Sequence, residues 1–466
     1  MAATDTDTIV AISTPPGRGG IGIVRLSGPQ AREASAPILR LRNELSPARA
    51  RFGNIIDTAD AHVLDECVVT FFAAPHSYTS EDVVEIAAHG SPVLLDYILR
   101  QCCAHGARLA EPGEFTQRAF LSGRLDLTQA EAVDDLIASS TLEQARAAAR
   151  QLGGALANLI APIKEDLVAL IAAIEAGIDF AEDDIDVLPA STIAAKIEAI
   201  HTPLAQLERS FAQGRVLREG FRLALVGRPN AGKSSLFNRL VERDRAIVTA
   251  TPGTTRDLVT EQVAIGGIPV ELIDTAGLRD STDEAERLGI AKSREALADA
   301  DLVLLVIDAS AGWSEEDAAV LKTIGAAGNV LEVWNKSDLV ADRASDIPFQ
   351  MMQPSHHTHT QLDPVHTSAI TGAGIPELRT AIIHAIGGNT GAIREAAMLT
   401  NLRQHQAVTS ALTGLDAATA AVTASIPHEM LMLDLYNALR GLDALTGATT
   451  SEDVLRLIFS KFCIGK

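Results

Sequence analysis

Residues 227–234 read GRPNAGKS, which fits the phosphate-binding pattern G-x-x-x-x-G-K-S. An apolar run of strand length precedes the pattern, and an apolar helical pattern follows it. Such a loop holds phosphates with its backbone N–H groups and with the N-terminus of the next helix. Lys233 reaches the β- and γ-phosphates, and the Ser234 hydroxyl suits Mg²⁺. The stretch predicts a nucleotide site formed by Asn230, Ala231, Gly232, Lys233, Ser234 and Ser235.

A second stretch supplies groups for the γ-phosphate. The strand-like sequence VELID ends in Asp274, whose carboxylate suits the coordination shell of Mg²⁺. Thr275, Ala276 and Gly277 follow it, and the N–H of Gly277 is suited to the γ-phosphate.

Two further stretches select guanine over adenine. NVLEVWN ends a strand pattern in Asn335 and is followed by Lys336, Ser337 and Asp338. A carboxylate at Asp338 can accept two N–H bonds from guanine N1 and N2, and Lys336 can lie along the base. Adenine offers an acceptor at N1 and would be rejected. Ser368 and Ala369, on a last strand, suit backbone hydrogen bonds to the guanine carbonyl.

The residues around the γ-phosphate differ from those of Ras-like GTPases. Leu278 stands where such proteins place a water-positioning Gln, so another polar group must orient the attacking water. The sequence TATPGTTRD at 249–257 is typical of a switch loop, in which Thr255 suits Mg²⁺. Asn230 and carbonyl groups of that loop could hold a monovalent cation where charge develops on the phosphates. Asn230 could equally cap the following helix.

These motifs require a parallel sheet whose strands end at one edge. Strand patterns occur in the order FRLALV, VELID, DLVLLVID, NVLEVWN and VHTS, with helical patterns between them. We therefore predict a doubly wound α/β G domain over residues 216–384.

The composition bounds the class of protein. A chain of 466 residues suggests two or three domains, and a net charge of −21 argues against coating nucleic acid by charge alone. Four cysteines make no disulfide framework, which predicts a reducing, cytoplasmic compartment. We expect no secretory signal and no membrane span, because LIAPIKEDLVALIAAIEAGIDF, the most apolar stretch, carries charges typical of an amphipathic helix.

Several stretches resemble the MnmE (TrmE) tRNA-modification GTPases when taken in order. They are TPPGRGGIGIVRLSG, YTSEDVVE, EPGEFTQRAFLSGRLDLTQAEAVDDLI, GRPNAGKSSL, TPGTTRD, DTAGLRDSTDEAERLGI and the terminal FCIGK. The resemblance covers nearly the whole chain and implies α/β domains plus an all-α domain. A folate-binding-like, dimerising α/β domain would span 1–118, and a helical domain would span 119–215 and 385–466, with the G domain inserted. Thr128 and Glu131 are also spaced as a capping box at a helix start.

The resemblance implies the activity and partners. Such proteins form homodimers and act with MnmG, an FAD-binding partner, in a heterotetramer. They install an aminomethyl or carboxymethylaminomethyl group on C5 of the wobble uridine of certain tRNAs. The carbon comes from 5,10-methylene-tetrahydrofolate or a related folate such as 5-formyl-tetrahydrofolate, and hydrolysis of GTP with Mg²⁺ and K⁺ is required.

The resemblance also assigns residues. It places K⁺ on Asn230, Thr249, Thr251 and Thr254, and Mg²⁺ on Ser234 and Thr255, with Ala250, Pro252 and Gly253 completing the GTP-contacting switch loop. Glu286 matches the acidic residue that orients the attacking water; without the resemblance, a solvated glutamate at a helix start is the simpler interpretation. Folate contacts are expected from Arg25, Glu85, Arg124 and Lys466. Glu85 could accept N–H bonds from the pterin ring, and Arg25 and Arg124 could hold the carboxylated tail.

The chain departs from the family at Ser80 and Ser91, where glycine is common, and at Arg124, where lysine is common. A positive φ at Ser80 would strain its turn. Cys463 is the fourth residue counted back from the last residue given. The following Ile-Gly-Lys is a poor prenylation signal, so a packing or incidental role competes with a thiolate that serves the modification chemistry.

Two other functions share the G-domain signatures. One is an RNA-binding, ribosome-assembly GTPase of the Era type, and the other is a nucleotide-dependent dimerisation switch without a role in chemistry. The long N-terminal region without a basic RNA-binding module disfavours the first.

Overall fold

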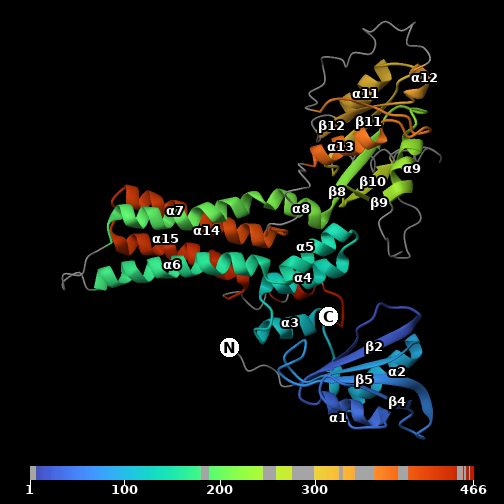
Figure 1. Ribbon diagram of the computed structural model, residues 1–466, viewed down its shortest axis with the longest axis vertical. Helices are drawn as coiled ribbons and strands as arrows, with labels where there is room; N and C mark the ends of the chain where they lie inside the picture. The colour runs from blue at the N-terminus through green and yellow to red at the C-terminus, as the bar shows by residue number, and fades with distance from the viewer. Residues whose placement is uncertain are drawn as a thin grey trace. The chain divides into compact units, whose positions relative to one another are not determined.

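The computed structural model describes residues 7–179, 188–244, 259–274, 299–324, 329–341, 362–386, 397–448, 455, 458–460 and 462–465 (Figure 1). These residues form two compact units. The first comprises Met1–Asp134, Arg150–Ile200 and Ala407–Lys466, and the second comprises Asp135–Ala149 and His201–Gln406. The predicted Glu286, the switch loop and Lys466 lie outside the described residues.

A seven-stranded sheet builds the N-terminal part of the first unit, in the order β3-β4-β5-β6-β2-β1-β7. Alternating burial along its strands places one face in a core with Val24, Ile86 and Ile98. Helix α2 (Pro92–Ala104) contributes to this core, and the short α1 (Ala31–Ser35) lies in the same layer. The strands are β1 (Thr8–Ile12), β2 (Gly19–Ser27), β3 (Leu39–Leu41), β4 (Ala50–Ile56), β5 (Val63–Phe72), β6 (Val83–Gly90) and β7 (Ala107–Leu109).

Helices follow the sheet along the chain. They are α3 (Glu114–Leu121), α4 (Leu127–Ala138), α5 (Leu142–Leu152), α6 (Ala155–Asp179), α7 (Ala190–Arg209), α8 (Phe211–Glu219), α14 (Leu402–Thr423) and α15 (His428–Thr446). The expected amphipathic helix is α6, and Figure 1 shows it running beside α15, which it contacts. Among the described residues, no helix is both long and apolar enough to cross a membrane.

Helices α14 and α15 approach each other backbone to backbone. A Cβ added to Gly414 would lie 2.7 Å from the backbone N of Ala438, and one added to Gly441 would lie 2.7 Å from that of Ala411. The two glycines thus sit reciprocally, each against the other helix, where a side chain has no room.

The start of α4 differs from the predicted capping box. Asp126 caps the helix, because its Oδ1 accepts the N–H of Gln129 and the side chain of Gln129 accepts the N–H of Asp126. Thr128 lies inside the helix, and its hydroxyl donates to Asp126. The prediction at Thr128 and Glu131 is therefore wrong by two residues, since both pairs share the same spacing.

The second unit contains a six-stranded sheet in the order β13-β12-β11-β8-β10-β9. All neighbouring pairs are parallel except β9 with β10. Its strands are β8 (Phe221–Val226), β9 (Val259–Ile265), β10 (Ile268–Asp274), β11 (Leu302–Asp308), β12 (Asn329–Asn335) and β13 (Val365–His366). The chain winds one way from β8 to β10 and the other way to β11, so a switch point lies beside the carboxyl end of β8.

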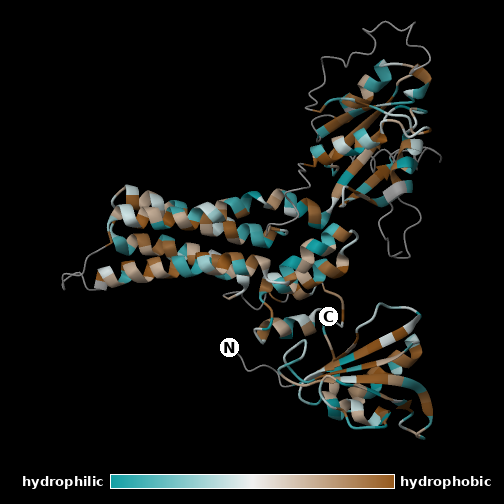
Figure 2. Cartoon of the chain, viewed as in Figure 1, coloured by the Kyte–Doolittle hydropathy of each residue, from teal (hydrophilic) through white to brown (hydrophobic). Residues whose placement is uncertain are grey.

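The helices that follow strands of this sheet along the chain are α9 (Lys233–Asp244), α11 (Glu315–Ile324), α12 (Asp338–Ala341) and α13 (Ile375–Ala385). Its two faces bury separate apolar clusters, one around Leu225 and Leu304 and the other around Ala224 and Val303. Figure 2 shows the strands as mainly hydrophobic, as expected for strands covered on both faces. The predicted fold class is confirmed: α/β sheets, a helical part and a doubly wound P-loop domain. The domain boundaries at 119, 216 and 385 stay predictions.

Candidate functional site

The loop between β8 and α9 is folded tightly around its own lysine. Lys233 begins α9, is 8% exposed, and donates from Nζ to the carbonyl oxygens of Gly227 and Arg228, both at 2.9 Å. Asn230 takes a left-handed conformation with φ of +64°. The backbone N–H groups of such a loop and of the first turn of α9 can bind phosphate. The ammonium of Lys233 adds a positive charge at this place.

A hydroxyl and a carboxylate meet beside this loop. Ser234 Oγ donates to Oδ2 of Asp274 at 3.0 Å, and Asp274 ends β10 with 6% of its surface exposed. Oxygen ligands of this kind suit Mg²⁺. The two side chains predicted for the metal shell are therefore brought together by the parallel pairing of β8 and β10.

Asn335 ties the base-recognition loops to the phosphate loop. It is 1% exposed at the end of β12, and its Nδ2 donates to the carbonyl of Ala231 at 3.1 Å. Its Oδ1 accepts the N–H of Ala369 at 3.1 Å. Asn335 thus bonds within the protein and fixes three loops of the site in one arrangement.

Lys336 and Asp338 follow on the same loop. Lys336 has φ of +64°, and its Nζ donates to Oδ2 of Asp308 at 2.7 Å. Asp338 begins α12, and its Oδ1 is buried without a hydrogen-bond partner among the described residues. An unpaired carboxylate oxygen is costly, and N–H donors of a bound base would relieve that cost.

The backbone donors predicted for the guanine carbonyl are already used. Ser368 donates its N–H to the carbonyl of Ala373 at 2.9 Å, and Ala369 donates to Asn335. Ser368 and Ala369 do not lie on the last strand, as predicted, but after it, because β13 ends at His366. They belong to a turn whose N–H groups bond partly within the turn and partly to Asn335. A base would have to displace one of these bonds to use either N–H.

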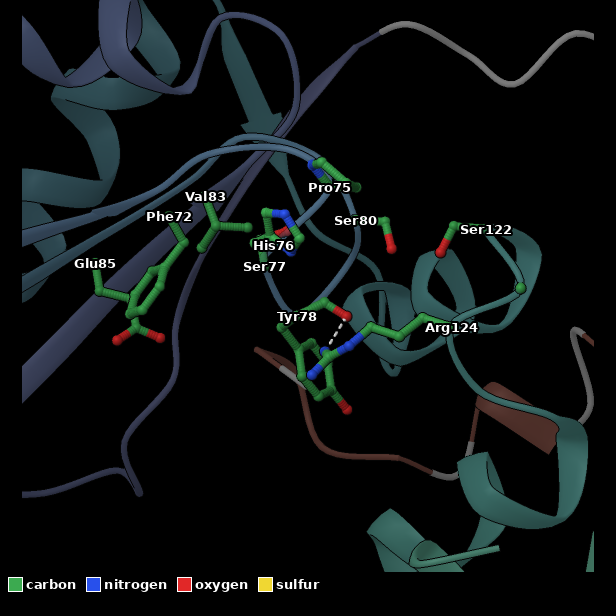
Figure 3. Close-up of a pocket in the computed structure, with 11 residues that line it drawn as sticks. Phe72, Pro75, His76, Ser77, Tyr78, Ser80, Val83, Glu85, Ser122 and Arg124 are labelled. Atoms are coloured by element: carbon green, nitrogen blue, oxygen red, sulfur yellow. Dashed lines mark hydrogen bonds between the residues drawn. The ribbon is translucent and has the colours of Figure 1, made fainter. Parts of the chain in front are cut away.

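A separate cavity of about 670 Å³ lies in the first unit (Figure 3). Its walls come from residues 72–85 and from the turn between α3 and α4. Glu85 and Arg124 both line it, and Figure 3 shows them on opposite sides of the space. The lining residues are Phe72, Pro75, His76, Ser77, Tyr78, Ser80, Val83, Glu85, Ser122, Gly123 and Arg124.

Arg25 pairs with Glu85 instead of standing free. The two residues face each other across β2 and β6, and Nε and Nη2 of Arg25 lie 2.9 and 2.7 Å from Oε1 of Glu85. Within the described part of the chain, Oε2 of Glu85 has no such partner. The ion pair fixes the carboxylate and leaves Oε2 to accept N–H donors of a ligand.

Tyr78 joins the two arginines. Arg124 donates from Nη1 to the carbonyl of Tyr78 at 2.6 Å, and its guanidinium lies 5.3 Å from the centre of the ring. The guanidinium of Arg25 lies 5.5 Å from the same ring. Sequence reasoning missed Tyr78, although an aromatic residue two positions before Ser80, in HSYTS, was a usable signal.

The C-terminal segment is bound to the same unit. The N–H of Gly113 donates to the carbonyl of Cys463 at 3.4 Å, and Ile464 forms an antiparallel bridge with Pro112. Gly113 caps α3, from which the hydroxyl of Thr116 lies 2.9 Å from that of Tyr78. Cys463 is exposed, which contradicts a buried packing role, and the choice between an incidental and a chemical role stays a prediction. Backbone contacts therefore connect the tail with the helix that supports the cavity wall.

Two family models match segments of the chain that together include the cavity and the nucleotide site. Residues 8–124 match the family description "GTP-binding protein TrmE N-terminus", and residues 127–463 match "MnmE helical domain". The tRNA modification GTPase MnmE of Koribacter versatilis is 57% identical over 463 residues, which cover 99% of each chain. The chain belongs to the MnmE family. The MnmE of Acetivibrio thermocellus is 40% identical over 463 residues, again 99% of each chain.

Two solved structures resemble the chain in part. The G domain of the T. maritima FeoB iron transporter is 29% identical, covers 35% of this chain and 98% of its own, and has a TM-score of 0.27. Era in complex with MgGDPNP and 16S ribosomal RNA is 25% identical, covers 42% of this chain and 66% of its own, and has a TM-score of 0.30. The two MnmE relatives each cover 99% of this chain, whereas these two structures cover 35% and 42% of it.

The positions predicted for folate, for the attacking water, for the γ-phosphate and for the switch loop fall partly outside the described residues. Glu286 and Lys466 do so, as do Thr275, Ala276 and Gly277 and the switch-loop residues Thr249, Ala250, Thr251, Pro252, Gly253, Thr254 and Thr255. Arg25, Glu85 and Arg124 lie at or beside one cavity. Ser235 lies on α9 and is exposed.

Of the two serines at which glycine was expected, Ser80 and Ser91, one is strained. Ser80 has φ of +65°, whereas Ser91 precedes α2 with φ of −89° and ψ of +120°. A left-handed conformation costs a residue with a Cβ about 1–2 kcal/mol. The condition for a strained turn is met at Ser80, in the wall of the cavity.

Ser80→Gly is expected to raise the free energy of unfolding by about 1 kcal/mol, because glycine adopts φ of +65° without a steric cost. Urea unfolding, monitored by far-UV circular dichroism, would measure this change in the free energy of unfolding. Ser91→Gly is the matched control and should be neutral or slightly destabilising, since its backbone is extended. An equal gain in both variants would contradict the strain at Ser80.

Proposed function

We propose that this tRNA modification GTPase transfers a folate one-carbon unit to C5 of the wobble uridine, together with an MnmG-type FAD-binding partner. The product carries an aminomethyl or carboxymethylaminomethyl group. The observation that supports this most strongly is the cavity with a fixed carboxylate and a guanidinium in its walls. It lies in the same unit as the bound C-terminal segment with Cys463.

The cavity has the chemistry that a folate needs. Oε2 of Glu85 can accept N–H bonds from a pterin ring, because Arg25 binds Oε1 and holds the carboxylate in place. Arg124 can bind a carboxylate of the tail, and the ring of Tyr78 offers an apolar face. A volume of about 670 Å³ is ample for such a ligand. The ligand would be 5,10-methylene-tetrahydrofolate, with 5-formyl-tetrahydrofolate as a stable probe, and Lys466 would be a further contact.

Arg25 has a different role here from the one predicted for it. Since its Nε and Nη2 both contact Oε1 of Glu85, it orients the pterin-binding carboxylate and is not free for the tail. The tail-binding role falls to Arg124, whose guanidinium contacts only a backbone carbonyl and a ring face among the described residues.

Nucleoside analysis of tRNA tests the function. A deletion strain complemented with the wild-type gene should contain the modified wobble uridine, and one complemented with a Glu85→Gln variant should contain far less. Glu66→Gln, on a neighbouring strand and outside the cavity lining, is the control. Normal modification in the deletion strain would exclude the proposed function and favour a dimerisation switch.

GTP, Mg²⁺ and K⁺ would bind at the second site. Lys233 and the loop N–H groups would hold the phosphates, Ser234, Asp274 and Thr255 the Mg²⁺, and Asn230 with Thr249, Thr251 and Thr254 the K⁺. The cations would stabilise negative charge on the phosphates. Glu286 would orient the attacking water in place of the missing Gln.

We expect hydrolysis to be faster in K⁺ than in Na⁺, and Asn230→Ala to remove the preference. Asn230→Gly is the matched variant, because it keeps φ of +64° without strain while deleting the ligand.

Glu286→Ala should bind GTP normally and hydrolyse it at least about ten-fold more slowly, since only a transition-state contact is lost. Phosphate release and GTP titrations measure both effects. Equal rates in both salts would exclude the cation's role, and a fully active Glu286→Ala would exclude the water-orienting one.

The assembly is proposed from the same resemblance. The protein would act in the cytoplasm as a homodimer, form a heterotetramer with the FAD-binding partner and bind tRNA. Light scattering of the purified chain, alone and mixed with the partner, would measure these masses. A monomer that does not change on mixing would contradict the assembly.

A further inference from the structure

Residues 308–317, here called the bridging loop, contact both ends of the nucleotide site. The loop runs from the end of β11 into the first turn of α11. At its start, Asp308 accepts a hydrogen bond from Lys336 of the base loop at 2.7 Å. At its end, Oδ1 of Asp317 lies 3.7 Å from Nε of Arg228 in the phosphate loop. The bridging loop lies outside the nucleotide-binding motifs, yet it contacts one residue of the base loop and one residue of the phosphate loop.

At the base end, Asp308 is held on both oxygens. Ser310 donates from its N–H and its hydroxyl to Oδ1, at 3.0 and 2.6 Å. Lys336 donates from Nζ to Oδ2. Partial burial opposes ionisation, but these hydrogen bonds keep the pKa of Asp308 below its usual value. Lysine has a long, flexible side chain, so a charged and oriented partner determines where its ammonium lies.

At the phosphate end, Asp317 is fully buried. Its Oδ2 accepts the N–H and the hydroxyl of Ser314, at 3.0 and 2.7 Å, and so caps α11. Its Oδ1 has no hydrogen bond among the described residues, so the guanidinium of Arg228 is the charge that compensates it. Arg228 also donates to the carbonyl of Gly312 at 3.2 Å.

The phosphate-binding lysine depends on the same arginine residue. The backbone carbonyl of Arg228 accepts one of the hydrogen bonds of Lys233. Fixing the side chain of Arg228 to the bridging loop therefore also fixes a carbonyl that orients the lysine. The two carboxylates act on different parts of the site: Asp308 on Lys336, and Asp317 on Arg228.

We propose that the bridging loop sets nucleotide affinity and base selectivity through two positioning residues. Asp308 places Lys336, and with it the loop that carries Asp338, against the base. Asp317 places Arg228 and the phosphate loop. The proposal deepens the guanine-nucleotide site and rests on that assignment.

Titration of GTP and of inosine triphosphate separates the two ends. Inosine lacks the 2-amino group and loses one bond to Asp338. The ratio of the Kd for inosine triphosphate to the Kd for GTP therefore reports base recognition. Asp308→Asn should weaken GTP binding about ten-fold and lower that ratio, because the base loop is no longer fixed. Asp317→Asn and Arg228→Gln should raise the Kd of both nucleotides by the same factor and leave the ratio of the two Kd values unchanged.

Controls keep the test decisive. Asp301→Asn, at the opposite end of β11, should bind like the parent, since its carboxylate contacts only the N–H of Arg222 among the described residues. Ser310→Ala removes a donor that orients Asp308 and should shift the ratio in the same direction, should Asp308→Asn not fold. Melting temperatures are measured for every variant.

The outcomes distinguish this proposal from the assignment on which it rests. A parent protein that binds no guanine nucleotide would exclude the guanine-nucleotide site itself. A parent that binds GTP, with Asp308→Asn and Ser310→Ala retaining both Kd values within about two-fold, would overturn only the role of the bridging loop. An equal loss for both nucleotides with a lowered melting temperature in Asp308→Asn would make Asp308 structural and overturn its positioning role.

Discussion

Cys463→Ser is expected to abolish wobble-uridine modification while the purified protein keeps its GTPase rate. Cys463 is the exposed one of the chain's four cysteines. Burial raises the pKa of Cys102 to about 12, and burial together with the charge of Asp65 does the same for Cys67, so these thiols stay protonated. An exposed thiol beside the helix that supports the cavity is the one that can act as nucleophile or acid.

The measurement is tRNA nucleoside mass spectrometry in a complemented deletion strain, beside GTP hydrolysis by the purified variant. Cys103→Ser is the matched control, since it lies on α2 and is only partly buried. It should leave both activities unchanged. Normal modification in Cys463→Ser would make the thiol incidental. Loss of both activities with a lower melting temperature would make it structural.

Asp338→Asn is expected to weaken GTP binding by more than about 2 kcal/mol, at least about 30-fold in Kd, because two charge-assisted bonds to guanine are lost. The free protein already leaves Oδ1 of Asp338 buried without a partner among the described residues. Replacing the carboxylate by an amide puts an N–H donor where the base also offers donors.

The same substitution should partly restore binding of xanthosine triphosphate, whose second carbonyl can accept from the new amide. Calorimetric titration of both nucleotides measures the exchange of preference. The matched control is Asp363→Asn, an exposed residue that precedes β13 and lies outside the site. Unchanged GTP affinity in Asp338→Asn would exclude the assignment of the base loop.

The nucleotide site was the part most accessible to sequence reasoning. Asp274 and Asn335 were predicted at strand ends and lie there, because runs of buried residues mark the strands of a parallel sheet clearly. What such patterns cannot give is which polar groups already satisfy one another. The N–H of Ala369 was predicted to face the base, yet it donates to Asn335.

Contacts between distant segments were less accessible still. The pairing of Arg25 with Glu85 depends on the register of β2 against β6, and register is set by the packing of the whole sheet. The capping box was misplaced because Asp126 and Gln129 have the same spacing as Thr128 and Glu131. The resemblance to a family in which glycine is common at position 80 raised the question of a positive φ at Ser80, and the structure answers it with φ of +65°.

The backbone contact between α14 and α15 bears on how this chain can be altered. Replacing a glycine in a helix by alanine is a common route to a more heat-stable protein, worth up to about 1 kcal/mol from helix propensity alone. At Gly414 and Gly441 the new methyl group would meet the backbone of the opposite helix, which cannot turn aside as a side chain can. In a chain already rich in helical alanine, these two positions are therefore closed to the cheapest single-residue improvement, and a library designed for thermostability should hold both fixed.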